Sequence, residues 1–161
     1  MSALRDDAGL AALTTIVLLP LLVVVLAGAL QLGAIRVSIA RVQAAADLAT
    51  LIAVNDQDDA ELARSGTLRL ADDAADVARE YFARELELST PLLAAAPAEI
   101  AGSADIAAFP IAPATDPRSG ARYDRPAVRI DAEVPLRTPI LGALAFRSVT
   151  TVRVFAMSSP R

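Results

Sequence analysis

The sequence predicts an α+β fold with a long N-terminal helix, a second amphipathic helix and a small antiparallel sheet. Three observations lead to this prediction. A nearly unbroken apolar run occupies positions 10–32, apolar residues continue at helical spacing after it, and an alternation of period two appears beyond Pro91. Helices followed by a short run of strands are typical of the α+β class, in which helices form a layer on the sheet.

The apolar run predicts a transmembrane helix over residues 10–33. At about 1.5 Å per residue it measures roughly 35 Å, whereas a bilayer's hydrocarbon core is about 30 Å thick. Its aliphatic residues between positions 16 and 26 together favour insertion by very roughly 3–6 kcal/mol. Pro20 removes one backbone donor and should kink or loosen the helix, which membrane helices tolerate. The alternative is a secretory signal cleaved after Ala29, although its apolar core would exceed the usual length.

Residues 34–54 are predicted to extend this helix, because neither proline nor glycine interrupts them. The apolar face of the extension consists largely of small residues, which permit close approach of a helix or a sheet. Its polar residues Arg36, Gln43, Asp47 and Thr50 are expected on the opposite side. The apolar face can pack on the chain's own domain or on another subunit. The candidate helix-packing or assembly residues are Pro20, Ala46, Asp47, Ala49 and Ala53.

The acidic segment 55–59 is expected to end the first helix. It does not form a calcium loop of the EF-hand type, because a loop begun at Asp56 would need glycine where Glu61 stands and glutamate where Thr67 stands. We expect Asp58 or Asp59 to cap the following helix instead. After a break at positions 65–66, an amphipathic helix is predicted over 68–88. Its apolar face comprises Leu70, Ala74, Val77, Ala78, Tyr81, Phe82 and Leu86.

The C-terminal part predicts strands. Residues 128–136 alternate apolar and polar, which predicts a half-buried strand with Asp131 and Glu133 facing solvent at a sheet edge. A second strand is predicted over 149–156, with an ambiguous buried face, and a weaker one over 100–111. The turn residues of 116–120 indicate a loop, and 138–146 is an apolar connection with a short turn of helix.

Composition excludes several function classes. The 161 residues include no cysteine and no histidine, so a disulfide framework, a thiolate site and the commonest metal ligand and general base are all missing. The net charge is −4 and no basic cluster is present, which argues against nucleic acid as a partner. We therefore expect neither an enzyme nor a bound cofactor or metal.

Two parts of the chain carry a family resemblance. Gly9 opens the apolar run, whose core reads Leu18-Leu19-Pro20-Leu21-Leu22, and Arg41-Val42-Gln43-Ala44-Ala45-Ala46-Asp47-Leu48-Ala49 follows at the outer end of the helix. Val134-Pro135-Leu136, Leu141-Gly142 and the stretch from Val149 to Ala156 add a looser match. The chain thus resembles the TadE/TadG-like proteins of the tight-adherence (Flp) pilus assembly system. The resemblance implies a pilin-like minor component in the cytoplasmic (inner) membrane. Residues 1–9 would be a cytoplasmic segment or leader, and residues 55–161 an extracytoplasmic domain.

The resemblance decides the orientation, which the few arginines around the span leave open. In processed members of the family a prepilin peptidase cuts after a glycine, which would place the cut between Gly9 and Leu10. Thr14 then stands where those members carry a glutamate that pairs with a neighbouring subunit, which fits a permanently anchored TadG-like protein better. The implied partners are the lipid bilayer, other pilin-like subunits or Tad assembly proteins, and prepilin peptidase. The alternative function is a single-pass anchored extracytoplasmic binding domain unrelated to pili.

Overall fold

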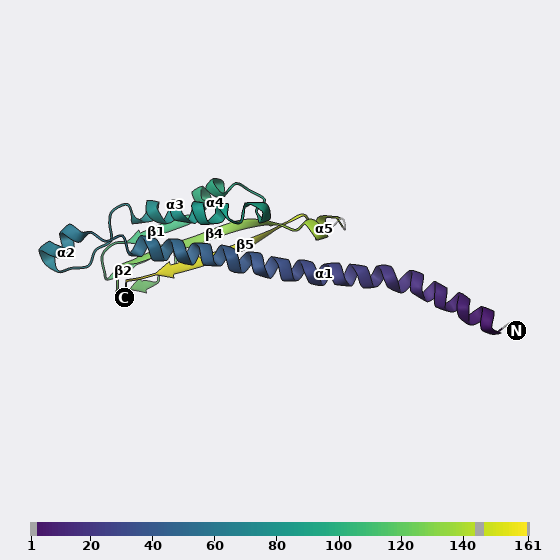
Figure 1. Cartoon of the computed structure of the whole chain (residues 1–161). Helices are drawn as coiled ribbons and strands as arrows, with labels where there is room; N and C mark the ends of the chain where they lie inside the picture. Colours follow the sequence, from purple (N-terminus) through teal and green to yellow (C-terminus); the bar gives the residue numbers. More distant parts are fainter. Residues whose placement is uncertain (1–2, 144–146, 161) are drawn as a thin grey trace.

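A single long helix dominates the structure. The computed structural model describes residues 3–143 and 147–160, and for residues 3–13 and 141 it describes the backbone alone. Helix α1 (Ala3–Val54) is 52 residues long and runs without interruption through the predicted span and its extension. The rest of the chain packs on its C-terminal half, and the N-terminal half projects away from the domain (Figure 1). The α+β prediction is confirmed, and the helix ends at the predicted position.

The remaining elements form two small sheets and several short helices. A three-stranded antiparallel sheet has the order β1–β4–β5, and β2 pairs with β3 in a separate hairpin. The elements are α2 (Asp59–Ser65), α3 (Ala74–Glu87), the 3-10 turn η1 (Thr90–Leu92), α4 (Pro97–Ser103), β1 (Asp105–Phe109), β2 (Ala114–Thr115), β3 (Arg122–Tyr123), β4 (Ala127–Arg137), α5 (Pro139–Ala143) and β5 (Val149–Ser158).

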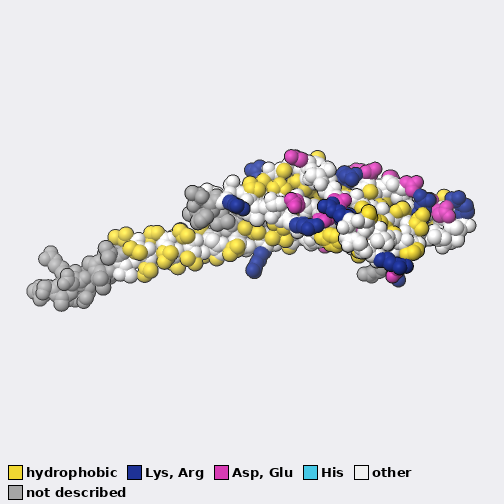
Figure 2. Space-filling model, turned by 180° about the vertical axis from the view of Figure 1, so that it is seen from behind, with side chains coloured by type: hydrophobic (Ala, Val, Ile, Leu, Met, Phe, Trp, Pro, Cys, Tyr) yellow, Lys and Arg dark blue, Asp and Glu magenta, His cyan; other side chains and the backbone are white. Residues whose placement is uncertain are grey.

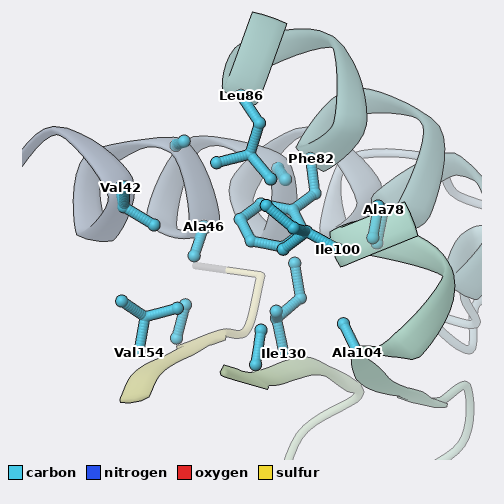
Figure 3. Packing of buried hydrophobic residues seen from close by; sticks show 14 of the residues in the cluster. Val42, Ala46, Ala78, Phe82, Leu86, Ile100, Ala104, Ile130 and Val154 are labelled. Atoms are coloured by element: carbon cyan, nitrogen blue, oxygen red, sulfur yellow. The ribbon is translucent and has the colours of Figure 1, made fainter. Parts of the chain in front are cut away.

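The hydrophobic core lies between one face of the main sheet and the helices α1 and α3 (Figure 3). Phe82 and Leu86 reach into it from α3, and small residues of α1 allow the helix backbone to approach closely. The predicted inward face of β4 is confirmed. Its buried residues are Val128, Ile130, Ala132, Val134 and Leu136.

The second amphipathic helix is shorter than predicted. It begins at Ala74 rather than at residue 68, because Leu70 is bridged to Gln57 in an extended conformation and its N–H donates to the carbonyl of Pro110. Leu70 is nevertheless buried, so it was correctly assigned to the core. The predicted cap is confirmed, since the Asp58 carboxylate accepts a hydrogen bond of 3.0 Å from the N–H of Glu61.

Two strand predictions need correction. The weak strand over 100–111 is wrong in its first part, because Pro97 starts helix α4 and the strand begins only at Asp105. The prediction that Asp131 lies at a solvent-facing edge is also wrong, since β4 is the central strand and the Asp131 side chain is largely covered. In β5, Val154 and Ala156 face the core while Phe155 faces outward.

The polar stripe of the first helix does not face solvent throughout, contrary to the prediction. The side chain of Gln43 donates to the carbonyl of Phe155 at 2.7 Å, and buried Thr50 is hydrogen-bonded to the Ser158 hydroxyl at 2.9 Å. Helix α1 contacts α3 on one side and β5 on another, so more than one face of it is covered. On the face of α1 that β5 covers, β5 supplies the hydrogen-bond partners of the polar side chains.

Replacing Ala49 with leucine is expected to lower the free energy of unfolding by about 1–3 kcal/mol, because the added methylenes have no room at a fully buried position. Chemical unfolding in detergent micelles, followed by circular dichroism, measures this change. Ala44→Leu is the matched control, since Ala44 is exposed on the same stretch of α1. Equal stability of the two variants would contradict close packing at Ala49.

Candidate functional site

From residue 14 to residue 30, α1 exposes an apolar surface that a helix in a soluble core would bury. Among the described residues, one helix is long and apolar enough to cross a membrane, and only 6% of its most apolar stretch is buried. Leu22, for example, is 65% exposed. Figure 2 shows hydrophobic side chains along the described part of this projecting helix. One such helix near the N-terminus is consistent with a single-pass anchor or with a signal sequence.

The sequence-predicted residues of this half lie within the helix. Pro20 is exposed, and α1 continues through it although its nitrogen cannot donate a backbone hydrogen bond. Gly9 and Leu10 belong to the helical backbone of α1, but their side chains lie outside the described residues. Cleavage between them therefore stays a prediction.

The helix meets its domain at Gln31. This side chain is 2% exposed, and its amide oxygen accepts a hydrogen bond of 3.0 Å from the N–H of Ile140, in the first turn of α5. Seven residues further along α1, about two helical turns, buried Ser38 donates to the carbonyl of Ala34 at 2.9 Å. The first buried side chain of α1 among the described residues thus lies within two residues of the predicted end of the span, although Leu32 and Val37 are still exposed.

The predicted packing residues beyond this junction serve the chain's own fold. Ala46, Ala49 and Ala53 are completely buried against the domain, while Asp47 is exposed and accepts a hydrogen bond from Gln43. The three alanines are therefore covered from within the chain. The free surface of this part of α1 lies elsewhere.

An exposed leucine patch, which the sequence analysis missed, occupies that free surface. We define it as Leu48 and Leu51 of α1 together with Leu88, which follows α3 and is 78% exposed. Leu48 and Leu88 line one shallow groove, together with Arg41 and Glu85, and Leu51 lies one helical turn beyond Leu48 on α1. The signal in the sequence was the pair of leucines that falls outside the small-residue face of the helix. The spacing of Leu48 and Leu51 alone does not show which face of the helix the domain covers.

A cluster of charges lies on the sheet face opposite the core. The side chain of Arg129 on β4 is 4% exposed; it lies 2.7 Å from Asp105 of β1 and 3.2 Å from Asp116, in the loop between β2 and β3. Arg153 of β5 donates to Asp131 at 2.8 Å, and Arg118 also pairs with Asp105. The hairpin loop is thereby attached to β4 through Asp116 and to β1 through Arg118, while the Arg153–Asp131 pair links β5 to β4.

These contacts lower the pKa values of three carboxyl groups. For Asp116, hydrogen bonds from the Ser119 hydroxyl and the Arg118 backbone lower the pKa. For Asp131, the bond from Arg153 lowers the pKa against the opposing effect of burial. Partial burial raises the pKa of Asp105, but the hydrogen bonds and charges of its two arginines together outweigh this effect, so it too lies below its ordinary value.

Acid is expected to destabilise the fold through these carboxylates. Because their pKa values in the folded chain lie below those of the unfolded chain, their contribution to stability is complete above about pH 4–5 and is lost as the pH falls through the folded values. Unfolding midpoints measured at a series of pH values below 5 test this. The fall should be shallower in Asp131→Asn than in Asp72→Asn, since the Asp72 side chain is exposed. The same dependence of the unfolding midpoint on pH in both variants would contradict a stabilising role of the Asp131 carboxylate.

The charge cluster neutralises its own carboxylates, and among the described residues no group of three or more His, Cys, Asp or Glu is arranged to hold a metal ion. The features that remain are the exposed apolar helix, its junction at Gln31 and the leucine patch. No protein-family model, no curated protein and no solved structure matches this chain. The resemblance to TadE/TadG-like proteins therefore stays a prediction, and what the structure shows is a long N-terminal apolar helix packed on a C-terminal α+β domain.

Proposed function

We propose that the protein is a membrane-anchored, pilin-like structural or assembly component of a Tad/Flp-type pilus or a related secretion apparatus. The observation that carries this proposal is the continuity of α1, which is apolar and largely exposed from residue 14 to residue 30 and contributes to the hydrophobic core from Val42 to Val54. Such a helix would hold the domain at the outer surface of the cytoplasmic membrane without a linker. The role is that of a minor pilin or pseudopilin rather than of an enzyme.

The leucine patch supports a lateral contact with another subunit. Exposed leucines on α1 and after α3 lie next to the membrane-distal half of the rod, where neighbouring pilin-like helices would run alongside it. Exposed leucines around a shallow groove, as Leu48 and Leu88 lie here, are typical of interaction sites. Pilin-like subunits or Tad assembly proteins are the proposed occupants.

Membrane attachment is the first test. We expect the full chain to fractionate with membranes and to resist extraction by alkaline carbonate, because an inserted apolar helix of this length is not released by charge disruption. Protease added to spheroplasts should degrade the domain after residue 54. Protection of the domain would reverse the proposed orientation, and a soluble product beginning at Leu30 would show a cleaved signal. Mass spectrometry of the mature N-terminus also reports whether prepilin peptidase cuts after Gly9.

The subunit contact is tested by purification in mild detergent. Pilin-like proteins of the same cell should co-purify with the wild-type chain and be lost from Leu88→Asp, which puts a charge into the leucine patch. Leu62→Asp in α2 is the matched control, since Leu62 is also exposed but lies outside the patch. Membrane attachment without any pilin-like partner would favour the alternative, an anchored extracytoplasmic binding domain unrelated to pili.

A further inference from the structure

The connection between β4 and β5 lies at the end of the domain that is nearest to the exposed apolar helix (Figure 1). Its helix α5 reads Pro139-Ile140-Leu141-Gly142-Ala143, and no charged residue stands between Arg137 and Arg147. α5 contacts α1, to which the bond from Ile140 to Gln31 ties it. An apolar turn is therefore held beside the predicted membrane span.

The position of Gln31 along α1 indicates how deep in the bilayer α5 would lie. Counted from the middle of residues 10–33, Gln31 lies about 14 Å along the helix axis, and half the hydrocarbon thickness is about 15 Å. The exposed Arg36 lies about 22 Å from the same point, at the level of the lipid headgroups. With the span centred in the bilayer, α5 would lie at the boundary between the hydrocarbon and the headgroups.

The turn is built in a way that suits this boundary. Buried Thr138 closes its base, because its N–H donates to the Ser148 carbonyl at 2.8 Å and its hydroxyl to the Arg147 carbonyl at 2.6 Å. Within α5, Pro139 has no N–H, Ile140 donates to Gln31, and Gly142 donates to the Thr138 carbonyl. Backbone donors that are bonded internally can enter an apolar medium at low cost.

We propose that α5 is a second membrane contact, which inserts into the outer headgroup–hydrocarbon boundary of the bilayer beside α1. The inference rests on the proposed anchoring of α1, because it takes its depth from that helix. The occupant is phospholipid: Pro139 and Ala143 are exposed, and the exposed Arg36 lies at the height of the phosphates, which it complements in charge; Arg147, which follows the turn, is exposed as well. α5 contacts α1 at Gln31, which stands between the exposed Leu30 and Leu32 at the end of the predicted span.

Single cysteines test this directly, because the chain has none of its own. Ala143→Cys, Ala60→Cys and Leu22→Cys are labelled with an environment-sensitive fluorophore, and the full chain is reconstituted into phosphatidylcholine–phosphatidylglycerol vesicles. Ala60 is the matched control, an exposed alanine on the short helix α2 at the far end of the domain from α5 (Figure 1). Quenching is then compared between lipids that carry a nitroxide near the headgroup and lipids that carry it deep in the acyl chain.

The label at position 143 should be quenched by the shallow nitroxide about twofold or more strongly than by the deep one, as expected for an interfacial segment. The label at position 22 should show the reverse order, and the label at position 60 should be quenched by neither. Quenching at 22 but not at 143 would overturn the inference and leave the anchor intact. No quenching at 22 would overturn the anchor itself. Shielding of position 143 from aqueous iodide without quenching by either lipid would show that protein covers α5, which also overturns the inference.

Discussion

Replacing Phe82 with alanine is expected to lower the free energy of unfolding by about 3–5 kcal/mol. The side chain is fully buried, and it points from α3 into the space between the helices and the sheet, near Ile100 and Ile130 (Figure 3). Its removal would leave a cavity that the backbones of three elements cannot easily close. Chemical unfolding of the detergent-solubilised chain measures the change in the midpoint and in the free energy.

Phe155→Ala is the matched control for this substitution. The same side chain is removed, but Phe155 is 52% exposed on the outer face of β5 and leaves no enclosed cavity. We expect Phe155→Ala to lower the free energy of unfolding by well under half of the amount expected for Phe82→Ala. Comparable losses for the two variants would contradict a core centred on Phe82, and would indicate that the outer face of the sheet is covered in the folded chain.

Replacing Arg129 with alanine is expected to lower the free energy of unfolding by about 3–5 kcal/mol, because it leaves the buried carboxylate of Asp116 without its cation. The pair is the link between the β2–β3 hairpin loop and the central strand. The hairpin should loosen before the main sheet does. Hydrogen exchange of the amides of residues 114–123 should therefore accelerate more than exchange in β4.

The control for Arg129 is Arg122→Ala. Arg122 is exposed, and its distance of 3.7 Å to Asp124 joins two solvated groups whose interaction contributes little. A change within about 0.5 kcal/mol is expected there. A double variant, Arg129→Met with Asp116→Asn, should recover part of the loss, since no uncompensated charge then remains. Failure of the double variant to recover stability would indicate that Arg129 acts through packing of its stem and not through charge.

The helical part of the fold could be predicted because its signal is local. The apolar run and the small-residue repeat specify one helix up to Val54, and the cap at Asp58 follows from its carboxylate alone. The start of α3 was placed too early because the apolar repeat includes Leu70. That residue is buried by a bridge to Gln57, a contact that helical spacing cannot distinguish from helix.

The charged face of the sheet could not be predicted, because its cause is not local. Alternation along β4 shows that Arg129 and Asp131 face away from the core, and solvent is the simplest assignment for such residues. What covers them is a loop from positions 116–120 together with Asp105 of the neighbouring strand. Likewise, the position of Thr50 in the polar stripe predicts exposure, but β5 lies beside it and the Ser158 hydroxyl is hydrogen-bonded to it. In each case the residues that cover the polar side chain come from a distant part of the sequence.

The unbroken course of α1 has a mechanical consequence. Residues 33 to 54 form a stiff helix about 30 Å long that is part of the domain, so under the proposed anchoring the domain would have no flexible joint at the lipid surface. A tilt of about 10° in the anchor would sweep the far end of the domain by about 5 Å. Membrane helices tilt to match the thickness of their bilayer. With α1 anchored as proposed, the thickness of the surrounding bilayer would therefore affect how far the domain leans.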